Sequence, residues 1–163
     1  MNFLFSMVVA LSLSSRLAYD VPEGWKAVEA SSSMRLAQWS YGAKSEVIVF
    51  HFGSGQGGSV EANLDRWYGQ FEQPDGGSTR ERAKVTKSKA GDLAITKIDI
   101  GGTYRAPVRP GAAEQHHEPG YRMLVAVVEG PSGPWFVRFL GPAKEIESGS
   151  GSFDAFLRSL RVK

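Results

Sequence analysis

The first group of residues that could do chemistry is a glycine-rich loop. Gly53, Gly55 and Gly58 satisfy the G-x-G-x-x-G pattern, with Asp75 about twenty residues on, and this arrangement is typical of dinucleotide binding. That binding unit needs a parallel strand directly after its helix, whereas this chain enters PDGGSTRER. A Walker loop needs Lys after its last glycine, and here Ser59 follows Gly58. We therefore do not predict nucleotide binding.

Two interpretations of this loop remain open. Its glycines let the chain fold over a sheet edge, or its amides, together with the next helix N-terminus, receive an anion or a partner's carboxylate. The second interpretation predicts ligand or partner binding by Gly55, Gln56, Gly57, Gly58 and Ser59. The predicted partner is a small anion or an unidentified protein.

Histidines form the second candidate group. His116 and His117 lie between Glu114 and Glu118, but adjacent side chains of an extended segment point to opposite sides. Nothing in the sequence fixes a third ligand, so we predict a solvated loop and no metal site. His51 shares a strand face with two valines and is predicted to be a satisfied, partly buried side chain.

Catalytic patterns are missing from the sequence. No serine lies in G-x-S-x-G, and the absence of cysteine excludes disulfides, thiolate zinc sites and cysteine nucleophiles. We therefore predict no catalytic residue and no cofactor, and we favour a protein that is not an enzyme. The alternative is a small hydrolase or a metal-dependent enzyme that uses His51 or the His116/His117 loop.

Charge gives little support for nucleic-acid binding. The formal net charge is +2, and the densest basic run is Arg80, Arg82, Lys84, Lys87 and Lys89. In a strand, Lys84 would point to one side while Lys87 and Lys89 point to the other. We interpret this run as a solvated edge strand guarded by lysines, and we expect no nucleic-acid partner.

An apolar run from Phe3 to Leu13 opens the chain. It is too short to span a bilayer, which takes about 20 residues, but it suits the apolar region of a secretory signal. We predict a signal peptide or apolar segment over residues 1–18, one domain over 19–163, no transmembrane span, and a periplasmic or secreted protein. A membrane-anchored or cytoplasmic protein is the alternative.

Hydrophobic periodicity predicts the elements that position these candidates. Strands are expected at residues 17–21, 25–29, 34–40 and 46–52. A helix is expected to follow Ser59, with hairpins over 84–104 and 121–140. Ser148 to Gly151 is expected to interrupt the helical region after Pro142, and Ser152 to cap a final helix. Trp25, Trp39, Trp67 and Trp135 are predicted core residues.

Three of these strands are apolar on both faces, among them EVIVFHF and YRMLVAVVE. An antiparallel sheet with one face in water would show polar residues at alternate positions. We therefore expect an α+β fold, an α/β/α sandwich in which helices cover both faces of a largely antiparallel sheet.

The order of elements resembles that of the PsbP-like superfamily, and YDVPEGW resembles the opening of many bacterial domains of this kind. The segments FHFGSGQGGSVEANLDRWYGQF, PGYRMLVAVVEGP and GPWFVRFLGP resemble a bacterial group of uncharacterised exported proteins. Together these segments extend over nearly all of the chain after Ala18. The resemblance implies the sandwich fold and no particular activity, because members share architecture while binding unrelated partners.

The predicted function is a non-enzymatic binding or assembly module of the cell envelope or extracytoplasmic space. The loops Gly53–Ser59 and Ala106–Gly120 are its expected contact surfaces, since binding residues collect on loops of a rigid scaffold.

Overall fold

The computed structural model describes residues 16–163. The apolar run at Phe3–Leu13, and with it the signal-peptide prediction, lies outside the described residues. In chain order the elements are β1 (Leu17–Ala18), β2 (Lys26–Ala27), β3 (Arg35–Tyr41), β4 (Ser45–His51), α1 (Val60–Tyr68), β5 (Phe71–Glu72), α2 (Thr79–Arg82), β6 (Lys84–Ala90), β7 (Leu93–Tyr104), β8 (Glu118–Glu129), β9 (Trp135–Pro142), α3 (Ala143–Ser159) and β10 (Arg161–Val162).

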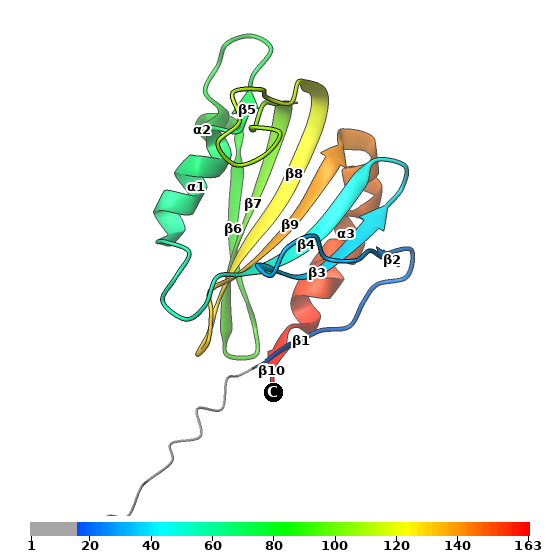
Figure 1. The fold of residues 1–163 in the computed structure, drawn as a ribbon, viewed down its shortest axis with the longest axis vertical. Coiled ribbons are helices and arrows are strands. Elements are labelled where there is room, and N and C mark those ends of the chain that lie inside the picture. The colour runs from blue at the N-terminus through cyan, green and yellow to red at the C-terminus, as the bar shows by residue number, and fades with distance from the viewer. Residues whose placement is uncertain (1–15) are drawn as a thin grey trace, which may run out of the picture.

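One antiparallel sheet dominates the molecule (Figure 1). Its strand order is β2-β3-β4-β9-β8-β7-β5, and β6 also pairs with β7. The predicted hairpins β6–β7 and β8–β9 are confirmed, with Ala90 opposite Leu93 and Val128 opposite Trp135. The central strands β4, β9 and β8 connect chain segments that lie far apart in sequence, so the faces of the sheet are assembled from distant residues.

Helix α3 covers one face of this sheet, which we call the closed face. Its stripe of Ile146, Phe153, Phe156 and Leu157 packs on alternate residues of β4, β8 and β9, and every member of the stripe is buried. Two tryptophans complete this cluster: Trp39 of β3, and Trp25, which directly precedes β2. As predicted, all four tryptophans are buried, Trp67 on the opposite face and Trp135 on this one.

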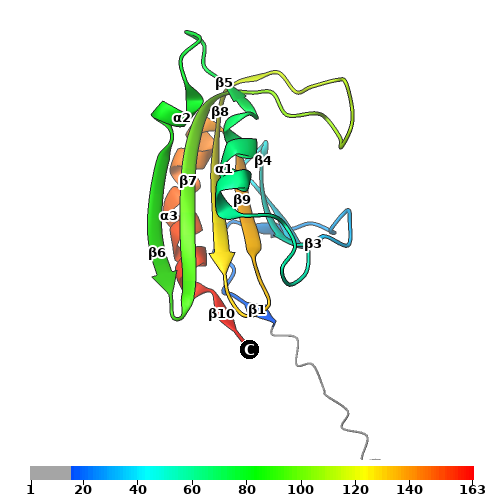
Figure 2. The same ribbon diagram turned by 90° about the vertical axis from the view of Figure 1, so that its left-hand side faces the viewer.

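The opposite face is covered only in part, so the expectation of helices over both faces is wrong. Strands make up 43% of the structure and helices 20%. Helix α1 has nine residues, and a helix about 10 Å in diameter covers about two strands spaced about 4.8 Å apart. It packs over β7 and β8 through Leu64, Trp67 and Tyr68, and it leaves the β4–β9 half of this face without a helix (Figures 1 and 2). We call this half the open face.

The fold is therefore a sheet-dominated antiparallel one. Apolar residues on both sides of a strand require cover, but that cover need not be helical. On the open face, aromatic side chains and the arginines that lie over them take the place of a second long helix.

The predicted break in the last helix is also wrong, because α3 is continuous from Ala143 to Ser159. The hydroxyls of Ser148 and Ser150 donate to the carbonyls of Glu145 and Glu147 within the helix. Gly149 lies where a Cβ would come within 2.7 Å of Phe139 Cζ. The glycine thus allows the helix to approach the sheet closely, and Ser152 caps nothing.

The lysines of the basic run lie on an edge strand, as predicted, whereas Arg80 and Arg82 lie in helix α2. Strand β6 pairs with β7 alone, and Lys84, Lys87 and Lys89 are all exposed. Over residues 16–163, no helix combines the length and the apolar character that crossing a bilayer demands.

Candidate anion-binding groove

A groove lies on the open face, between α1, strands β4 and β9, and the loop that follows β7. It encloses about 760 Å³. Its floor comes from cross-strand partners in register, with Ile48 opposite Arg138 and Phe50 opposite Phe136. Partners directly opposite each other in an antiparallel pair place their side chains on the same face, so Arg138 emerges beside Phe50.

A β-bulge brings a second arginine to this floor. Arg35 pairs with Phe50 and Ala37 pairs with Val49, so Leu36 is the extra residue of β3. A bulge of this kind re-aims the side chains that flank it. The Arg35 guanidinium carbon lies 5.7 Å from the Phe50 ring centre, and that of Arg138 lies 5.5 Å from the same ring.

Helix α1 supplies the third arginine. Arg66 donates to Asn63 Oδ1 at 2.8 Å, and its guanidinium lies 5.8 Å from the Trp67 ring centre. Burial lowers the pKa of Arg66, and the charge of Arg138 lowers it further. Two guanidinium groups from different elements therefore repel each other across the groove.

The groove carries an excess of positive charge. Five basic residues line it, Arg35, Lys44, Arg66, Arg109 and Arg138, against the two acids Glu46 and Glu118. One ion pair neutralises part of this charge, because Arg138 Nη2 lies 2.8 Å from Glu46 Oε1. Within residues 16–163, none of the other four basic residues has a carboxylate within ion-pair distance. Such a site attracts anions.

The deep end of the groove is a smaller pocket of about 180 Å³, here called the inner pocket. Its walls are apolar and mostly aromatic, formed by Phe50, Phe52, Trp67, Val125 and Phe136. Its polar groups come from Arg66, Gln70 and Arg138. An apolar pocket with a few convergent polar groups is the usual form of a small-molecule site.

Two buried polar atoms at the inner pocket lack partners. Over residues 16–163, neither Arg138 Nε nor Gln70 Oε1 has a hydrogen-bond partner. An unsatisfied buried polar atom costs about 1–3 kcal/mol. A ligand that drew either atom into a hydrogen bond would remove part of that cost.

The loop after β7 forms the outer wall of the groove. It is tied to itself by a bridge between Pro107 and Gln115 and by the bond from His116 N to Ala106 O (2.9 Å). The His116 ring stacks on Tyr104, with ring centres 5.3 Å apart. Burial raises the pKa of Tyr104. Of the two loops predicted as contact surfaces, this one lines the groove.

The predicted loop of Gly55, Gln56, Gly57, Gly58 and Ser59 lies before α1 (Figure 1), and its Gly57 packs against Phe52 and Phe136, two walls of the inner pocket. The Ser59 hydroxyl accepts from Ala62 N, as predicted for an N-cap. Gly57 has φ +92° and lies where a Cβ would meet the Phe136 ring at 2.8 Å, so a glycine is required there for close approach.

The chemical surroundings of this loop differ from those of the groove. A cavity of about 220 Å³ beside Gly58 and Ser59 is lined by Glu129 and by no basic residue among those described. Glu61, in the first turn of α1, adds a second negative charge. Whether the loop binds an anion stays a prediction, but its charge is less suited to that role than the charge of the groove.

The three histidines do not assemble into a site. His51 Nε2 donates to Ser132 O at 2.5 Å, and its ring stacks on Trp135 at 5.4 Å. His51 therefore lies near the end of β8, where Trp135 pairs with Val128, whereas His116 lies near the start of that strand. The two histidines are thus at opposite ends of β8. In residues 16–163, no three His, Cys, Asp or Glu side chains come together as metal ligands.

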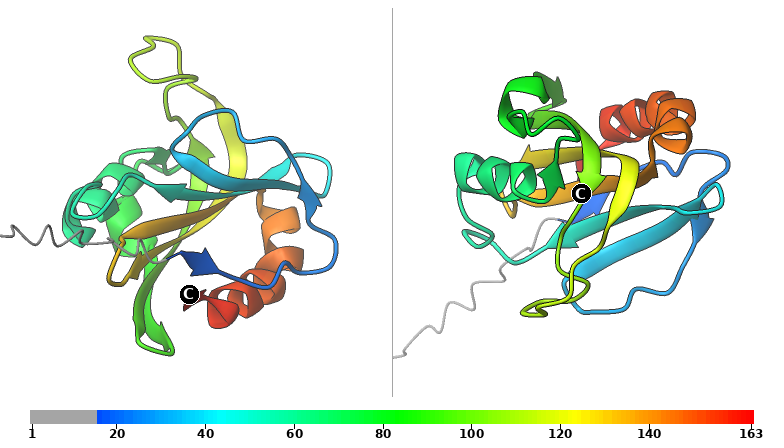
Figure 3. Two further views of the ribbon diagram at one scale, coloured as in Figure 1. Left: turned by 60° about the horizontal axis from the view of Figure 1, so that its bottom comes forward. Right: turned by 90° about the horizontal axis from the view of Figure 1, so that it is seen from above.

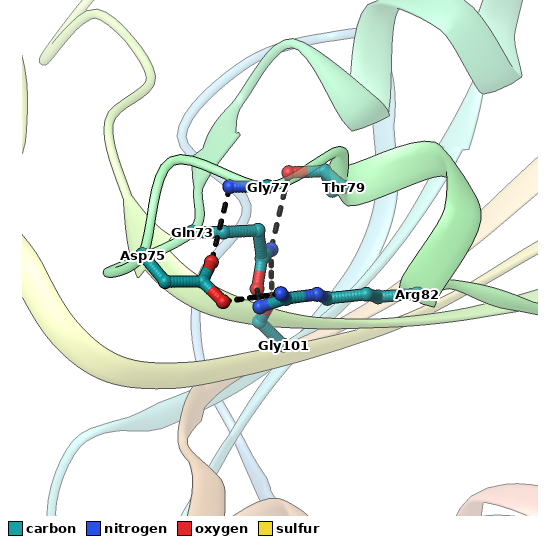
Figure 4. Close-up of polar contacts among 6 residues, drawn as sticks. All are labelled: Gln73, Asp75, Gly77, Thr79, Arg82 and Gly101. Carbon is teal, nitrogen blue, oxygen red and sulfur yellow. Dashed lines mark hydrogen bonds and ion pairs between the residues drawn. The ribbon is translucent and has the colours of Figure 1, made fainter.

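A separate polar cluster joins β5, α2 and β7 (Figure 4). Arg82 pairs with Asp75 at 2.5 Å, and Gly77 N donates to the same carboxylate. Gln73 Nε2 donates to Gly101 O at 2.8 Å and to Thr79 Oγ1 at 3.1 Å. The members of this cluster bond to one another, so we interpret it as structural.

Comparisons with known proteins do not assign the chain to a family. No family model matches it, and no curated protein matches it. The resemblance to the PsbP-like superfamily stays a prediction.

The groove and the convergence of Arg35, Arg66 and Arg138 on it were not predicted from the sequence. One signal was available for Arg138, which is a charged residue inside the otherwise apolar strand WFVRFL. A charge in such a strand must find a partner or a ligand. The bulge that places Arg35 and the approach of Arg66 have no signal of their own in the sequence.

Proposed function

We propose that this protein is a non-enzymatic binding module whose site is the groove on the open face, and that its ligand carries an anionic group. The observation that carries the proposal is the convergence of Arg35, Arg66 and Arg138 on one groove. Arg35 and Arg138 both lie over the Phe50 ring, and a single carboxylate, that of Glu46, is paired among the three. Guanidinium groups bind carboxylates and phosphates through paired hydrogen bonds.

The unpaired positive charge of the groove favours a binding role for its arginines over a structural one. Arginines that only stabilise a fold are usually matched by carboxylates of the same chain, because an unmatched charge near a surface of low polarity is costly. The groove instead retains three more positive than negative charges, with His116 neutral. Its volume of about 760 Å³ lies within the range of small-ligand sites.

The test is a titration of the isotope-labelled protein with acetate, inorganic phosphate and citrate at low ionic strength, followed by amide resonances. We expect shifts at Phe50, Gln70 and Arg138 that grow with the charge of the anion and weaken with salt. The same spectra report on Gly55 to Ser59, so they compare the groove directly with the glycine loop. Silence at the groove amides for all three anions would overturn the proposal.

Two variants separate the site from general charge effects. Arg66→Gln removes one groove cation and is expected to weaken citrate binding at least about tenfold, in the range for a charged hydrogen bond. Arg80→Gln removes a cation that pairs with Asp65 on the outer surface of the same region and is expected to leave binding unchanged. Equal weakening by both variants would indicate only a nonspecific response to net charge.

The proposed location is the cell envelope or extracytoplasmic space, and it rests on the apolar run Phe3–Leu13. Cell fractionation with N-terminal sequencing of the mature protein tests it. A chain that begins at Met1 in the cytoplasmic fraction would contradict this location without affecting the groove.

A further inference from the structure

The inner pocket narrows the class of ligand, on the premise that the groove is the binding site. Its 180 Å³ is close to the size of an apolar cavity that holds one benzene ring, roughly 150 Å³. The pocket offers few polar groups to satisfy the hydroxyls of a sugar ring. A single flat ring or a short branched side chain fits it.

The lining favours a flat aromatic ring. Phe52 and Trp67 each contact the ring of Phe136, at 5.6 Å and 6.0 Å between ring centres, in tilted and edge-to-face arrangements. A further ring can continue this pattern, since aromatic pairs prefer such offset and edge-on geometries. The guanidinium groups of Arg66 and Arg138 lie at the same pocket, and guanidinium groups also stack on aromatic faces.

The polar residues of the inner pocket determine where the negatively charged group of the ligand binds. Arg66, Gln70 and Arg138 line both the inner pocket and the wider groove. They therefore stand at the junction between the two spaces, so an anionic group bound there is separated from the ring by only a few bonds. The wider groove leaves room for the rest of a longer molecule.

We infer that the groove binds an aromatic carboxylate, with the ring in the inner pocket and the carboxylate at Arg66 and Arg138. This chemistry has two sources, a free aromatic acid or the C-terminal aromatic residue of a peptide. The shared element is a benzene-sized ring one to three bonds from a carboxylate.

The experiment measures dissociation constants for four small probes by calorimetry or amide shifts of the full chain. Phenylacetate carries both features, acetate lacks the ring, benzyl alcohol lacks the charge, and cyclohexylacetate replaces the flat ring by a bulkier one. We expect phenylacetate to bind at least about tenfold more tightly than acetate, the gain that burial of one ring supplies. It should also bind at least about tenfold more tightly than benzyl alcohol, which cannot form the charged hydrogen bonds of a carboxylate with arginine. Cyclohexylacetate is expected to bind several-fold more weakly than phenylacetate.

Two variants locate the ring. Phe52→Leu changes a half-buried wall of the inner pocket and is expected to weaken phenylacetate while leaving acetate unchanged. Val85→Ala changes an exposed apolar residue of β6, outside the groove, and should alter neither. The indole N–H resonance of Trp67 provides a readout that does not depend on affinity, because a ring in the pocket shifts it and acetate does not.

Two further probes separate the sources. N-acetylphenylalanine and a tetrapeptide ending in phenylalanine share the ring and carboxylate, and only the tetrapeptide extends along the wider groove. Tighter binding of the tetrapeptide indicates a peptide ligand, and equal binding indicates a free acid.

The outcomes distinguish this inference from the proposed function. If acetate and phenylacetate bind equally at the groove, or if cyclohexylacetate matches phenylacetate, the aromatic ligand is wrong and the anion-binding role stands. If benzyl alcohol binds as tightly as phenylacetate, the carboxylate requirement is wrong. If no anion shifts the groove resonances, both proposals fail.

Discussion

The two faces of the central sheet handle charge in different ways. On the closed face, Arg122 donates two hydrogen bonds to Asp99, at 2.8 and 2.7 Å, and Lys97 pairs with Asp154 of α3 at 2.6 Å. On the open face, Arg35 and Arg66 bond to the neutral amides of Gln38 and Asn63. Both faces place basic residues beside a hydrophobic core. The closed face pairs both of these basic residues with carboxylates, whereas of the three groove arginines on the open face only Arg138 has such a partner within residues 16–163, Glu46.

The views along the sheet show the same contrast in shape (Figures 2 and 3). Helix α3 lies along one side, while on the other side α1 sits toward one edge and the loop after β7 extends away from α3. We therefore expect stability to be concentrated on the closed face and, under the proposed function, binding to be concentrated on the open one. Four predictions test this division, from the largest expected effect to the smallest.

The first prediction compares an aromatic residue from each face. Phe139→Ala empties a fully buried position against Phe153 and Trp25 and should reduce the free energy of unfolding by about 3–5 kcal/mol. Phe52→Ala, at a half-buried position of the open face, should cost less than half as much. Urea unfolding of both variants provides the measurement, and equal losses would contradict the division.

The second prediction concerns the approach of α3 to the sheet. Gly149→Ala would place a Cβ 2.7 Å from Phe139 Cζ and 2.9 Å from Tyr41 Cε1, and overpacking of this kind costs about 1–3 kcal/mol. Gly151→Ala is the matched control in the same helix, because nothing lies within 4 Å of its Cβ position. The control should stabilise the protein by up to about 1 kcal/mol. Thermal unfolding distinguishes the two, and stabilisation by both would show that α3 does not pack closely at Gly149.

The third prediction compares arginines. Arg122→Gln leaves Asp99 without its paired donor and should destabilise the fold by about 1–2 kcal/mol, the scale of a charged hydrogen bond. Arg66→Gln should be neutral or slightly stabilising, because it removes a repulsion with Arg138. Such a gain in stability is expected where a binding site is held in an unfavourable arrangement. A larger loss of unfolding free energy for Arg66→Gln than for Arg122→Gln would refute the comparison.

The fourth prediction is a pH dependence at the edge of the closed face. The carboxylate of Glu145 accepts from Ala43 N, Lys44 N and Ser45 Oγ. Burial acts to raise the pKa of Glu145, but these hydrogen bonds outweigh it and lower the pKa below its ordinary value.

A folded-state pKa below the unfolded one gives stability that is present above the unfolded value, about 4.3 for Glu, and is lost as the pH falls through the folded value. The wild type should therefore lose more stability than Glu145→Gln between about pH 5 and pH 3, by less than about 1 kcal/mol for this partly exposed group. Chemical unfolding of both proteins across this range checks the difference, and parallel curves would show that Glu145 contributes no such dependence.

Much of the fold follows from local patterns. The apolar runs EVIVFHF and YRMLVAVVE locate β4 and β8, the turn at Ala90–Gly91–Asp92 locates the β6–β7 hairpin, and the stripe after Ser59 locates α1. Ser78 and Glu81 form a capping pattern that was available for the missed helix α2. These signals depend on neighbours in the chain, so they can be read without knowing the tertiary structure.

The errors occurred where distant residues decide the outcome. The break expected at Ser148–Gly151 follows from helix propensity, but packing of Gly149 against Phe139 and Tyr41 overrides it. A second helical layer was expected because strands that are apolar on both faces must be covered on both. The sequence pattern does not show how much of the second face the nine residues of α1 cover.

Local sequence patterns predicted the long strands, helix α1, a helical C-terminal region, the buried tryptophans and the lysine-guarded edge, because each is encoded by the period and type of adjacent residues. Long-range packing, in contrast, determines that only one face of the sheet is covered by a long helix, α3, and that Arg35, Arg66 and Arg138 line the same groove. These arginines come from β3, α1 and β9. Their meeting depends on a bulge, a strand register and the position of a helix, and long-range packing sets all three.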